Sequence, residues 1–452
     1  MPSRLGDCTT FQQYRIFAIM VLLSIILSSP YKTASGFCAA FSNRAVKKNH
    51  LRHGSLYAIS ERWYFADYET NESSDTTKES SSTPSRKKIV FLGTPEVAAT
   101  TLQTLHEASQ KQQQHSFEIS AVVSQPPKRQ GRKKKLVQSP VAQLALELDL
   151  PLITPEKANK KDFLDHLQND IQPDLCITAA YGQYLPKRFL AAPALGTVNI
   201  HPSLLPRWRG ASPVQRSLEA GDNPVGVTVL YTVSAMDAGP IIAQQEYTCD
   251  EQTENASILL PLLFEKGTNM LLDNLPALFD QRMTMDTAQP QNDDHAVAAP
   301  LIHSSEAELK PWQESARDMH NRMRGFSMWP QTFLYMQVYE DADSDEPLLE
   351  KPFKVKVLET RYLEEPAEEH TTVVQLGPHK KKDGMRVVCH DKSVLELIRV
   401  IKVGNNKPFM AKDLQNGYPG KVLRWVESPE PEEGLLPPKP LPKTKTAATT
   451  ES

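Results

Sequence analysis

Short apolar runs alternate with segments of helical periodicity between residues 87 and 285. The first two runs, 87–92 (KKIVFL) and 119–124 (ISAVVS), have the length of buried strands, and apolar positions recur at helical spacing between them. The alternation continues with a helical segment at 141–148, strands at 174–181, 196–201 and 226–232, and a helix that starts at 213. Strand–helix alternation of this kind predicts an α/β domain built on an open, mostly parallel sheet of the Rossmann-like class.

A second pattern begins after residue 302. A helical segment at 315–324 is followed by short β-like runs at 354–360, 371–376, 385–390 and 394–403. These runs predict a small β-rich, barrel-like C-terminal domain. Residues 286–302 join the two patterns, and their polar, Pro-containing composition predicts a linker.

The first sixty residues differ from the rest of the chain. Arg4 and Arg15 precede an apolar run at 16–27, which has the length of a signal-peptide core and is short for a membrane span. Residues 37–60 carry basic side chains and no acidic one, a composition typical of transit peptides. The combination resembles the two-part presequences of algae with complex plastids. It predicts an organellar protein, with the plastid favoured over the mitochondrion and a single membrane anchor as the alternative.

Two further segments are polar and of low complexity. Ser and Thr dominate 61–86, and Pro and Lys dominate 427–452, so both are predicted to be disordered. The predicted layout is a targeting presequence at 1–60, a linker at 61–86, an α/β domain at 87–285, a linker at 286–302, a C-terminal domain at 303–426 and a tail at 427–452.

Length and cysteine content narrow the class of protein. A chain of 452 residues is long enough for two domains, and its net charge of −3 favours no particular partner. The five cysteines are far apart and include no C-x-x-C pair, which predicts free thiols and neither a disulfide framework nor a metal site. The chain also lacks G-x-G-x-x-G and P-loop motifs, so we expect no nucleotide cofactor.

The candidate chemistry begins in residues 196–213 (GTVNIHPSLLPRWRGASP). Asn199 and His201 alternate with an apolar residue, so they project from the same face of the predicted strand. They lie at its carboxyl end, where open α/β sheets bind ligands. Ser212 and Gly221 are predicted to cap the two ends of the following helix. Taken alone, the Asn–His pair is also compatible with a purely structural role.

Asp237 changes this interpretation. It stands in a sharp polar turn (MDAG, 236–239) directly after another predicted strand. If the strands are neighbours, its carboxylate can reach His201 and hold the imidazole beside the amide of Asn199. A carboxylate, an imidazole and an amide donor together are typical of acid–base catalysis with oxyanion stabilisation.

A basic cluster follows the second strand. Residues 128–135 (KRQGRKKK) carry six positive charges, on Lys128, Arg129, Arg132, Lys133, Lys134 and Lys135. Because they follow a strand end, they are expected on the ligand side of the sheet. Phosphate binding is the natural use of such a cluster, and a solvated surface loop is the alternative.

Several segments resemble the methionyl-tRNA formyltransferase family. The resemblance is specific from residue 87 to 278 and weaker through the C-terminal domain, where 406–414 (NKPFMAKDL) is family-like. The matching segments are 91–102 (FLGTPEVAATTL), 179–186 (AAYGQYLP), 199–218 (NIHPSLLPRWRGASPVQRSL), 226–230 (GVTVL) and 236–242 (MDAGPII). The N-I-H, S-L-L-P and D-A-G elements also occur in other folate-dependent formyltransferases and in formyltetrahydrofolate hydrolases, whereas RWRGASPVQRSL points more narrowly to the tRNA enzymes.

The resemblance implies a Rossmann-like formyltransferase domain that uses 10-formyltetrahydrofolate as donor and methionyl initiator tRNA as acceptor, without a metal. It assigns catalysis to Asn199, His201 and Asp237. It assigns folate binding to Ser203, Leu204, Leu205 and Pro206. It assigns tRNA contacts to the 128–135 cluster with Arg207 and Arg209.

In the implied reaction the amine attacks the formyl carbon. Asn199 and protonated His201 would donate hydrogen bonds to the oxyanion, and Asp237 would orient His201. The sequence leaves open whether His201 or water accepts the proton of the amine. We expect a monomer that has no stable membrane association after processing.

Two alternatives to this function stay open. One is a formyltetrahydrofolate hydrolase or a formyltransferase of small amines, which would need neither the basic cluster nor a second domain. The other is a non-catalytic RNA-binding module, which would not need Asn199, His201 and Asp237 together.

Overall fold

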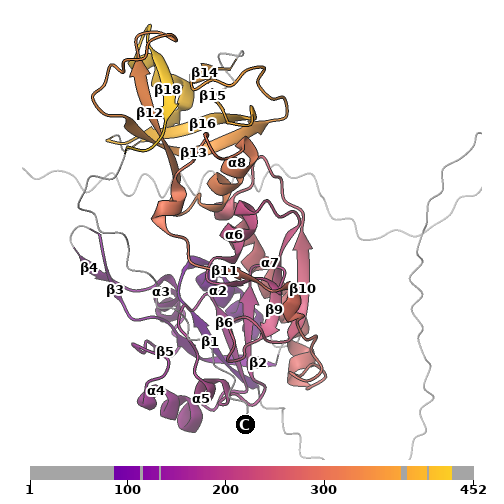
Figure 1. The fold of residues 1–452 in the computed structure, drawn as a ribbon. Helices are drawn as coiled ribbons and strands as arrows, with labels where there is room; N and C mark the ends of the chain where they lie inside the picture. Colours follow the sequence, from indigo (N-terminus) through magenta and orange to yellow (C-terminus); the bar gives the residue numbers. More distant parts are fainter. Residues whose placement is uncertain (1–85, 112–115, 132–133, 378–383, 405–406, 430–452) are drawn as a thin grey trace, which may run out of the picture. The chain divides into compact units, whose positions relative to one another are not determined.

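The structure is a computed structural model that describes residues 86–111, 116–131, 134–377, 384–404 and 407–429 (Figure 1). The predicted presequence, the linker up to residue 85 and the tail from residue 430 lie outside the described residues. No helix among the residues described is long and apolar enough to cross a membrane.

A seven-stranded sheet forms the frame of the N-terminal domain. Its order is β10 (Ile241–Tyr247), β9 (Val225–Tyr231), β7 (Thr197–His201), β6 (Leu175–Ala179), β1 (Lys87–Gly93), β2 (Phe117–Val123) and β5 (Leu152–Ile153). The strands from β5 to β7 are parallel, whereas β9 runs antiparallel to β7 and β10 antiparallel to β9. The predicted open, mostly parallel α/β sheet is confirmed.

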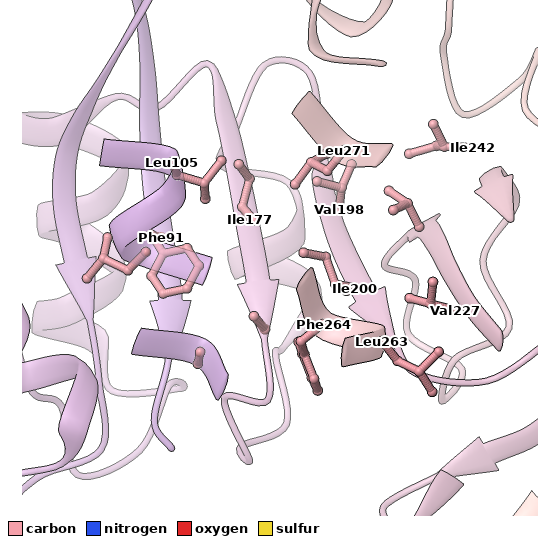
Figure 2. Packing of buried hydrophobic residues seen from close by; sticks show 14 of the residues in the cluster. Phe91, Leu105, Ile177, Val198, Ile200, Val227, Ile242, Leu263, Phe264 and Leu271 are labelled. Atoms are coloured by element: carbon pink, nitrogen blue, oxygen red, sulfur yellow. The ribbon is translucent and has the colours of Figure 1, made fainter. Parts of the chain in front are cut away.

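The central strands are apolar because helices cover the sheet. Every residue of β6 and β9 is buried. In Figure 2, Leu263 and Phe264 of α7 (Ala256–Phe279) lie close to Ile200 of β7. The helix approaches so closely that a Cβ added at Gly267 would lie 2.5 Å from the Ile200 side chain. This packing holds β7, and therefore the strand end that carries His201, in a fixed place.

Shorter helices complete the N-terminal domain. They are α2 (Glu96–Gln110), α3 (Pro140–Glu147), α4 (Lys161–His166), α5 (Lys187–Leu190) and α6 (Pro213–Glu219). Helix α6 begins at Pro213 as predicted, and Gly221 follows its end with φ +74°. Ser212 occupies the N-cap position of α6 as predicted, but its side chain makes no capping hydrogen bond. Its ψ of 51° departs from the extended backbone that capping side chains need.

The C-terminal domain is an antiparallel, curled sheet with one helix, α8 (Ala316–Gly325), packed on it. Its strands are β12 (Thr332–Tyr339), β13 (Phe353–Leu363), β14 (Gln375–Leu376), β15 (Met385–Val388), β16 (Val394–Lys402), β17 (Phe409–Met410) and β18 (Val422–Val426). The predicted β-rich, barrel-like class is confirmed, and Trp312 stacks on Trp425 against this core.

Residues 286–302, predicted as a linker, contain ordered structure. The strand β11 (Val297–Ala299) pairs in parallel with β8 (Arg207–Gly210). Gln289 and Ile241 exchange backbone hydrogen bonds of 2.7 and 2.9 Å. The segment is therefore held against the N-terminal domain at two places.

Helix α8 contacts the loop that precedes α7. Buried His320 donates from Nε2 to the Glu251 carbonyl oxygen at 2.7 Å, and its Nδ1 lies 2.8 Å from the Thr360 hydroxyl. Burial lowers the pKa of His320 to about 4, so the ring is neutral near pH 7. Buried Arg324 donates from Nε to the Glu254 carbonyl oxygen at 2.7 Å.

Candidate active site

The end of β7 carries the amide of Asn199. Its Oδ1 accepts a hydrogen bond of 2.7 Å from the Thr178 hydroxyl on the neighbouring strand β6. This contact directs the NH2 group away from Thr178, and Nδ2 has no hydrogen-bond partner among the described residues. Asn199 therefore presents a donor that is already oriented by the sheet.

The imidazole of His201 lies between two acceptors. Its Nε2 donates to the Trp208 carbonyl oxygen at 2.9 Å, and its Nδ1 lies 3.7 Å from Oδ2 of Asp237. The residue is only 4% exposed. A ring with protons on both nitrogens can donate in both directions, whereas the neutral ring that donates to Trp208 has only a lone pair on Nδ1.

Asp237 reaches His201 through a loop that folds back over the strand ends. Because β9 is antiparallel to β7, its end lies beside the start of β7, where the Thr232 N–H donates to the Thr197 carbonyl at 2.7 Å. The loop 232–240 then returns toward β8. There, Oδ2 of Asp237 accepts a hydrogen bond of 2.9 Å from the Gly210 N–H.

The three predicted catalytic residues are thus brought to one place. Sequence reasoning anticipated that Asp237 approaches His201, but not that its loop must reverse direction to do so. The structure gives each group a distinct position: a donor on Asn199, a bridged ring on His201 and a partly buried carboxylate on Asp237. Their catalytic roles stay a prediction.

Asp222 fixes the carbonyl group that holds His201. Its carboxylate accepts hydrogen bonds from Nε1 of Trp208, from the Ser217 hydroxyl and, at 2.9 and 3.0 Å, from the guanidinium of Arg207. Burial disfavours the charged form, but these hydrogen bonds outweigh it and keep the pKa of Asp222 below its ordinary value. Arg207 also lies over the Trp208 ring at 4.5 Å. Its predicted tRNA contact stays a prediction.

The four residues predicted to bind folate form the turn after β7. Ser203 is buried and donates to the Arg207 carbonyl at 2.8 Å. Leu204 covers Gly226 of β9, and Leu205 packs with apolar residues of β9 and β10. Pro206 is partly exposed. These contacts explain how the turn keeps its shape, and folate binding by it stays a prediction.

The basic cluster forms a hairpin, which the sequence did not predict. Its strands are β3 (Lys128–Gln130) and β4 (Lys135–Val137), paired antiparallel (Figure 1). Lys128, Arg129, Lys134 and Lys135 are exposed, and Arg132 and Lys133 lie outside the described residues. Lys128 bonds to Gln125 at 2.6 Å, and Gln125 in turn donates to the Tyr181 carbonyl oxygen at the end of β6. The hairpin is therefore anchored at the strand ends, and its contact with tRNA stays a prediction.

Arg209 makes its contacts inside the N-terminal domain. Its guanidinium donates to Oε1 of Gln291 at 2.8 and 3.0 Å and to Asp293 at 2.8 Å. The side chain is 15% exposed. These contacts do not test the tRNA contact predicted for Arg209.

Sequence reasoning missed Thr178, the Trp208 carbonyl, the Gly210 N–H and Gln291. Two of these groups belong to the backbone and leave no mark in a side-chain pattern. Gln291 stands in a segment whose composition is that of a linker. Only the spacing of Thr178 from the end of its strand could have placed it beside Asn199.

The described residues contain no cluster of three or more His, Cys, Asp or Glu side chains that could hold a metal ion. A cavity of about 900 Å³ lies in the C-terminal domain and is lined by 363–371 and parts of β14 to β16. None of the predicted site residues lines it.

Comparison with known proteins extends over both domains. The formyl transferase family model matches residues 87–273, and the formyl transferase C-terminal domain model matches residues 302–419. A methionyl-tRNA formyltransferase of Clostridioides difficile (strain 630) is 32% identical over 330 residues, which cover 73% of this chain and 96% of that protein. The chain belongs to the methionyl-tRNA formyltransferase family. A methionyl-tRNA formyltransferase of Staphylococcus aureus (strain JH1) is also 32% identical, over 74% of this chain and 99% of its own length.

The comparison with solved structures gives more distant likenesses. HypX from Aquifex aeolicus, crystallised with tetrahydrofolic acid, is 14% identical over 72% of this chain and 46% of its own, with a TM-score of 0.46. The predicted enzyme class rests on the methionyl-tRNA formyltransferase relatives, and they confirm it. Residues 274–301 lie between the two matched segments and include β11 and Gln291.

Proposed function

We propose that this chain transfers the formyl group of 10-formyltetrahydrofolate to the amino group of methionyl initiator tRNA, and that it does so in an organelle. The relatives support the formyl transfer reaction, because they match this chain over 96% and 99% of their own lengths and through both domains. A hydrolase or a small-amine enzyme would not need the second domain that this chain shares with these relatives.

The reaction exchanges one C–N bond for another. The amine nitrogen of the methionyl group attacks the formyl carbon, and negative charge develops on the formyl oxygen. When the bond from the formyl carbon to N10 of the folate breaks, N10 takes up a proton and the new amide nitrogen has lost one. The enzyme must therefore stabilise one oxyanion and move one proton.

Asn199 is suited to the oxyanion. Its NH2 group has no partner among the described residues, and the Thr178 hydroxyl fixes its direction in advance. A donor that needs no reorganisation stabilises developing charge most effectively. The folate donor fits this site because its formyl oxygen supplies the acceptor that Nδ2 lacks.

His201 and Asp237 are suited to the proton. With Nε2 held by the Trp208 carbonyl, Nδ1 is the nitrogen on the side of Asp237. A proton on Nδ1 can be donated to the Asp237 carboxylate or to one of the reacting groups. Asp237 is itself held by the Gly210 N–H, so the pair is positioned by β8.

The test is formyl transfer by the full chain from 10-formyltetrahydrofolate to charged initiator tRNA, with free methionine and water as alternative acceptors. We expect transfer to the tRNA, and His201→Ala should lower kcat by about 100- to 1,000-fold. His166→Ala is the matched control, because His166 is an exposed histidine on α4. Transfer only to water or to free methionine would contradict the proposal, as would near-normal turnover of a folded His201→Ala chain.

The organellar part of the proposal rests on residues 1–60 alone. Their signal-like core and basic, acid-free continuation are typical of targeting sequences. We expect residues 1–60 to direct a fused fluorescent protein into the plastid, with the mitochondrion as second choice. A diffuse cytosolic signal, or residence in the endoplasmic reticulum membrane, would contradict it.

A further inference from the structure

Gln291 connects Arg209 to the loop that carries Asp237. Its Nε2 donates to the carbonyl oxygens of Asp237 at 2.8 Å and Gly239 at 2.7 Å. Its Oε1 accepts two hydrogen bonds from the guanidinium of Arg209, at 2.8 and 3.0 Å. Both hydrogens and the oxygen of this amide are therefore used, and Arg209 determines which way the amide faces.

The loop needs such support because its backbone is unusual. Asp237 has φ +50°, in the left-handed region that residues other than glycine adopt uncommonly. Gly239 lies so close to β9 that an added Cβ would be 1.7 Å from the Tyr231 carbonyl oxygen. The two hydrogen bonds of Gln291 bracket this tight turn, one at each of these residues.

The side chain of Asp237 is held by β8, the strand that also carries Arg209. The Gly210 N–H donates to Oδ2 of Asp237 at 2.9 Å, and Gly210 directly follows Arg209 in β8. The backbone of β8 thus fixes the carboxylate, while the side chain of Arg209 fixes the loop through Gln291. Both contacts act on the loop that places the Asp237 carboxylate 3.7 Å from His201.

We propose that Gln291 is a positioning residue for Asp237, and that Arg209 acts by holding Gln291 and not by binding tRNA phosphate. The assignment rests on the proposed function, because it names residues that act on the same reaction through Asp237. It also gives the segment 286–302 a part in catalysis.

Gln291→Glu separates the two halves of the contact. The carboxylate can still accept from Arg209, but it has no hydrogen to donate to the Asp237 and Gly239 carbonyls. We expect kcat for formyl transfer to fall by about 10- to 100-fold, while KM for methionyl-tRNA changes by less than about twofold. Gln289→Ala is the matched control. The Gln289 side chain is exposed and makes no hydrogen bond in the described part of the chain, so this variant should keep normal kinetics.

Two further variants test the pathway through Asp237. Arg209→Lys replaces the two-pronged donor by a single ammonium, and it should lower kcat without changing the salt dependence of tRNA binding. In an Asp237→Ala background, Gln291→Glu should lower kcat by less than about twofold, because residues that act through one another are not additive. Should Gln291→Glu fail to fold in a thermal-unfolding control, Arg209→Lys and Gln291→Ala carry the same test.

The outcomes separate this inference from the function on which it rests. A folded Gln291→Glu variant with the kcat of the wild type would overturn the inference. So would a double variant in which the effects of Gln291→Glu and Asp237→Ala on kcat add in full. In either case, formylation of tRNA by the wild-type chain would still support the proposed function. A higher KM and a flatter salt dependence in Arg209→Lys would assign Arg209 to tRNA and overturn its role here. A wild-type chain that formylates no tRNA would overturn the proposed function, and this assignment with it.

Discussion

The buried His320 should make the stability of the C-terminal domain depend on pH. Burial lowers its pKa to about 4, against an ordinary value of 6.5. The folded state therefore keeps the ring neutral over a range in which the unfolded chain binds a proton. Stability from this source is fully present above pH 6.5 and is lost as the pH falls from 6.5 through 4.

The size of the effect follows from the two pKa values. At pH 5 the unfolded ring is almost entirely protonated and the folded ring is mostly neutral. Linkage then gives a loss of about 2 kcal/mol in the free energy of unfolding between pH 8 and pH 5 from this one residue. The hydrogen bonds fit this direction, since the neutral ring donates to the Glu251 carbonyl and can accept from the Thr360 hydroxyl.

The assay is urea unfolding of wild type and His320→Gln at pH 8 and pH 5. Tryptophan fluorescence reports on the right region, because Trp312 and Trp425 stack in the core on which α8 packs. The wild type should lose about 2 kcal/mol more than His320→Gln over this interval. His390→Gln, at an exposed histidine of the same domain, should behave like the wild type. Equal losses in wild type and His320→Gln would refute the reasoning.

Two other substitutions test the site and the basic hairpin. Gly239→Ala places a Cβ 1.7 Å from the Tyr231 carbonyl oxygen, so the loop must move by more than about 1 Å. We expect thermal unfolding to show a loss of about 1 to 3 kcal/mol in stability, and steady-state kinetics to show a loss of about 100-fold in kcat. Wild-type kinetics would show that the loop has room to relax. Replacing the six basic residues in 128–135 by neutral ones should weaken the binding of methionyl-tRNA, while folate binding is retained. The salt dependence of tRNA binding should flatten by about 0.7 to 0.9 log units for each phosphate that is no longer neutralised. An unchanged slope in a binding titration would make the hairpin an ordinary solvated surface.

Strands with a buried face could be predicted from the sequence. β1 and β6 are largely apolar because helices cover both faces of the parallel part of the sheet, and β9 is buried between α7 on one face and the 203–206 turn on the other. The hairpin of β3 and β4 escaped prediction because each strand has only three residues and Lys128, Arg129 and Lys135 are charged and exposed, so no periodicity marks it. β5 has only two residues and leaves no pattern of its own.

The part of the site that could be predicted from the sequence consists of side chains whose chemistry is evident from their residue type. Asn199 and His201 share a strand face, and strand alternation alone places them together. The approach of Asp237 could be expected only on the condition that its strand neighbours β7, because nothing local shows that its loop folds back. Gln291 could not be found, since its partners are backbone carbonyls more than fifty residues away in the chain.

The pairing of β11 with β8 affects where this protein can be divided. A fragment that ends at residue 285, where the composition changes, would retain Asn199, His201 and Asp237 but lack Gln291 and the strand beside Gly210. Such a fragment would contain every residue of the predicted catalytic trio and the Gly210 N–H, but it would lack the two hydrogen bonds from Gln291 to the loop of Asp237. A fragment that extends to Pro300 keeps these contacts, so the structural boundary of the N-terminal domain lies about fifteen residues beyond the change in composition.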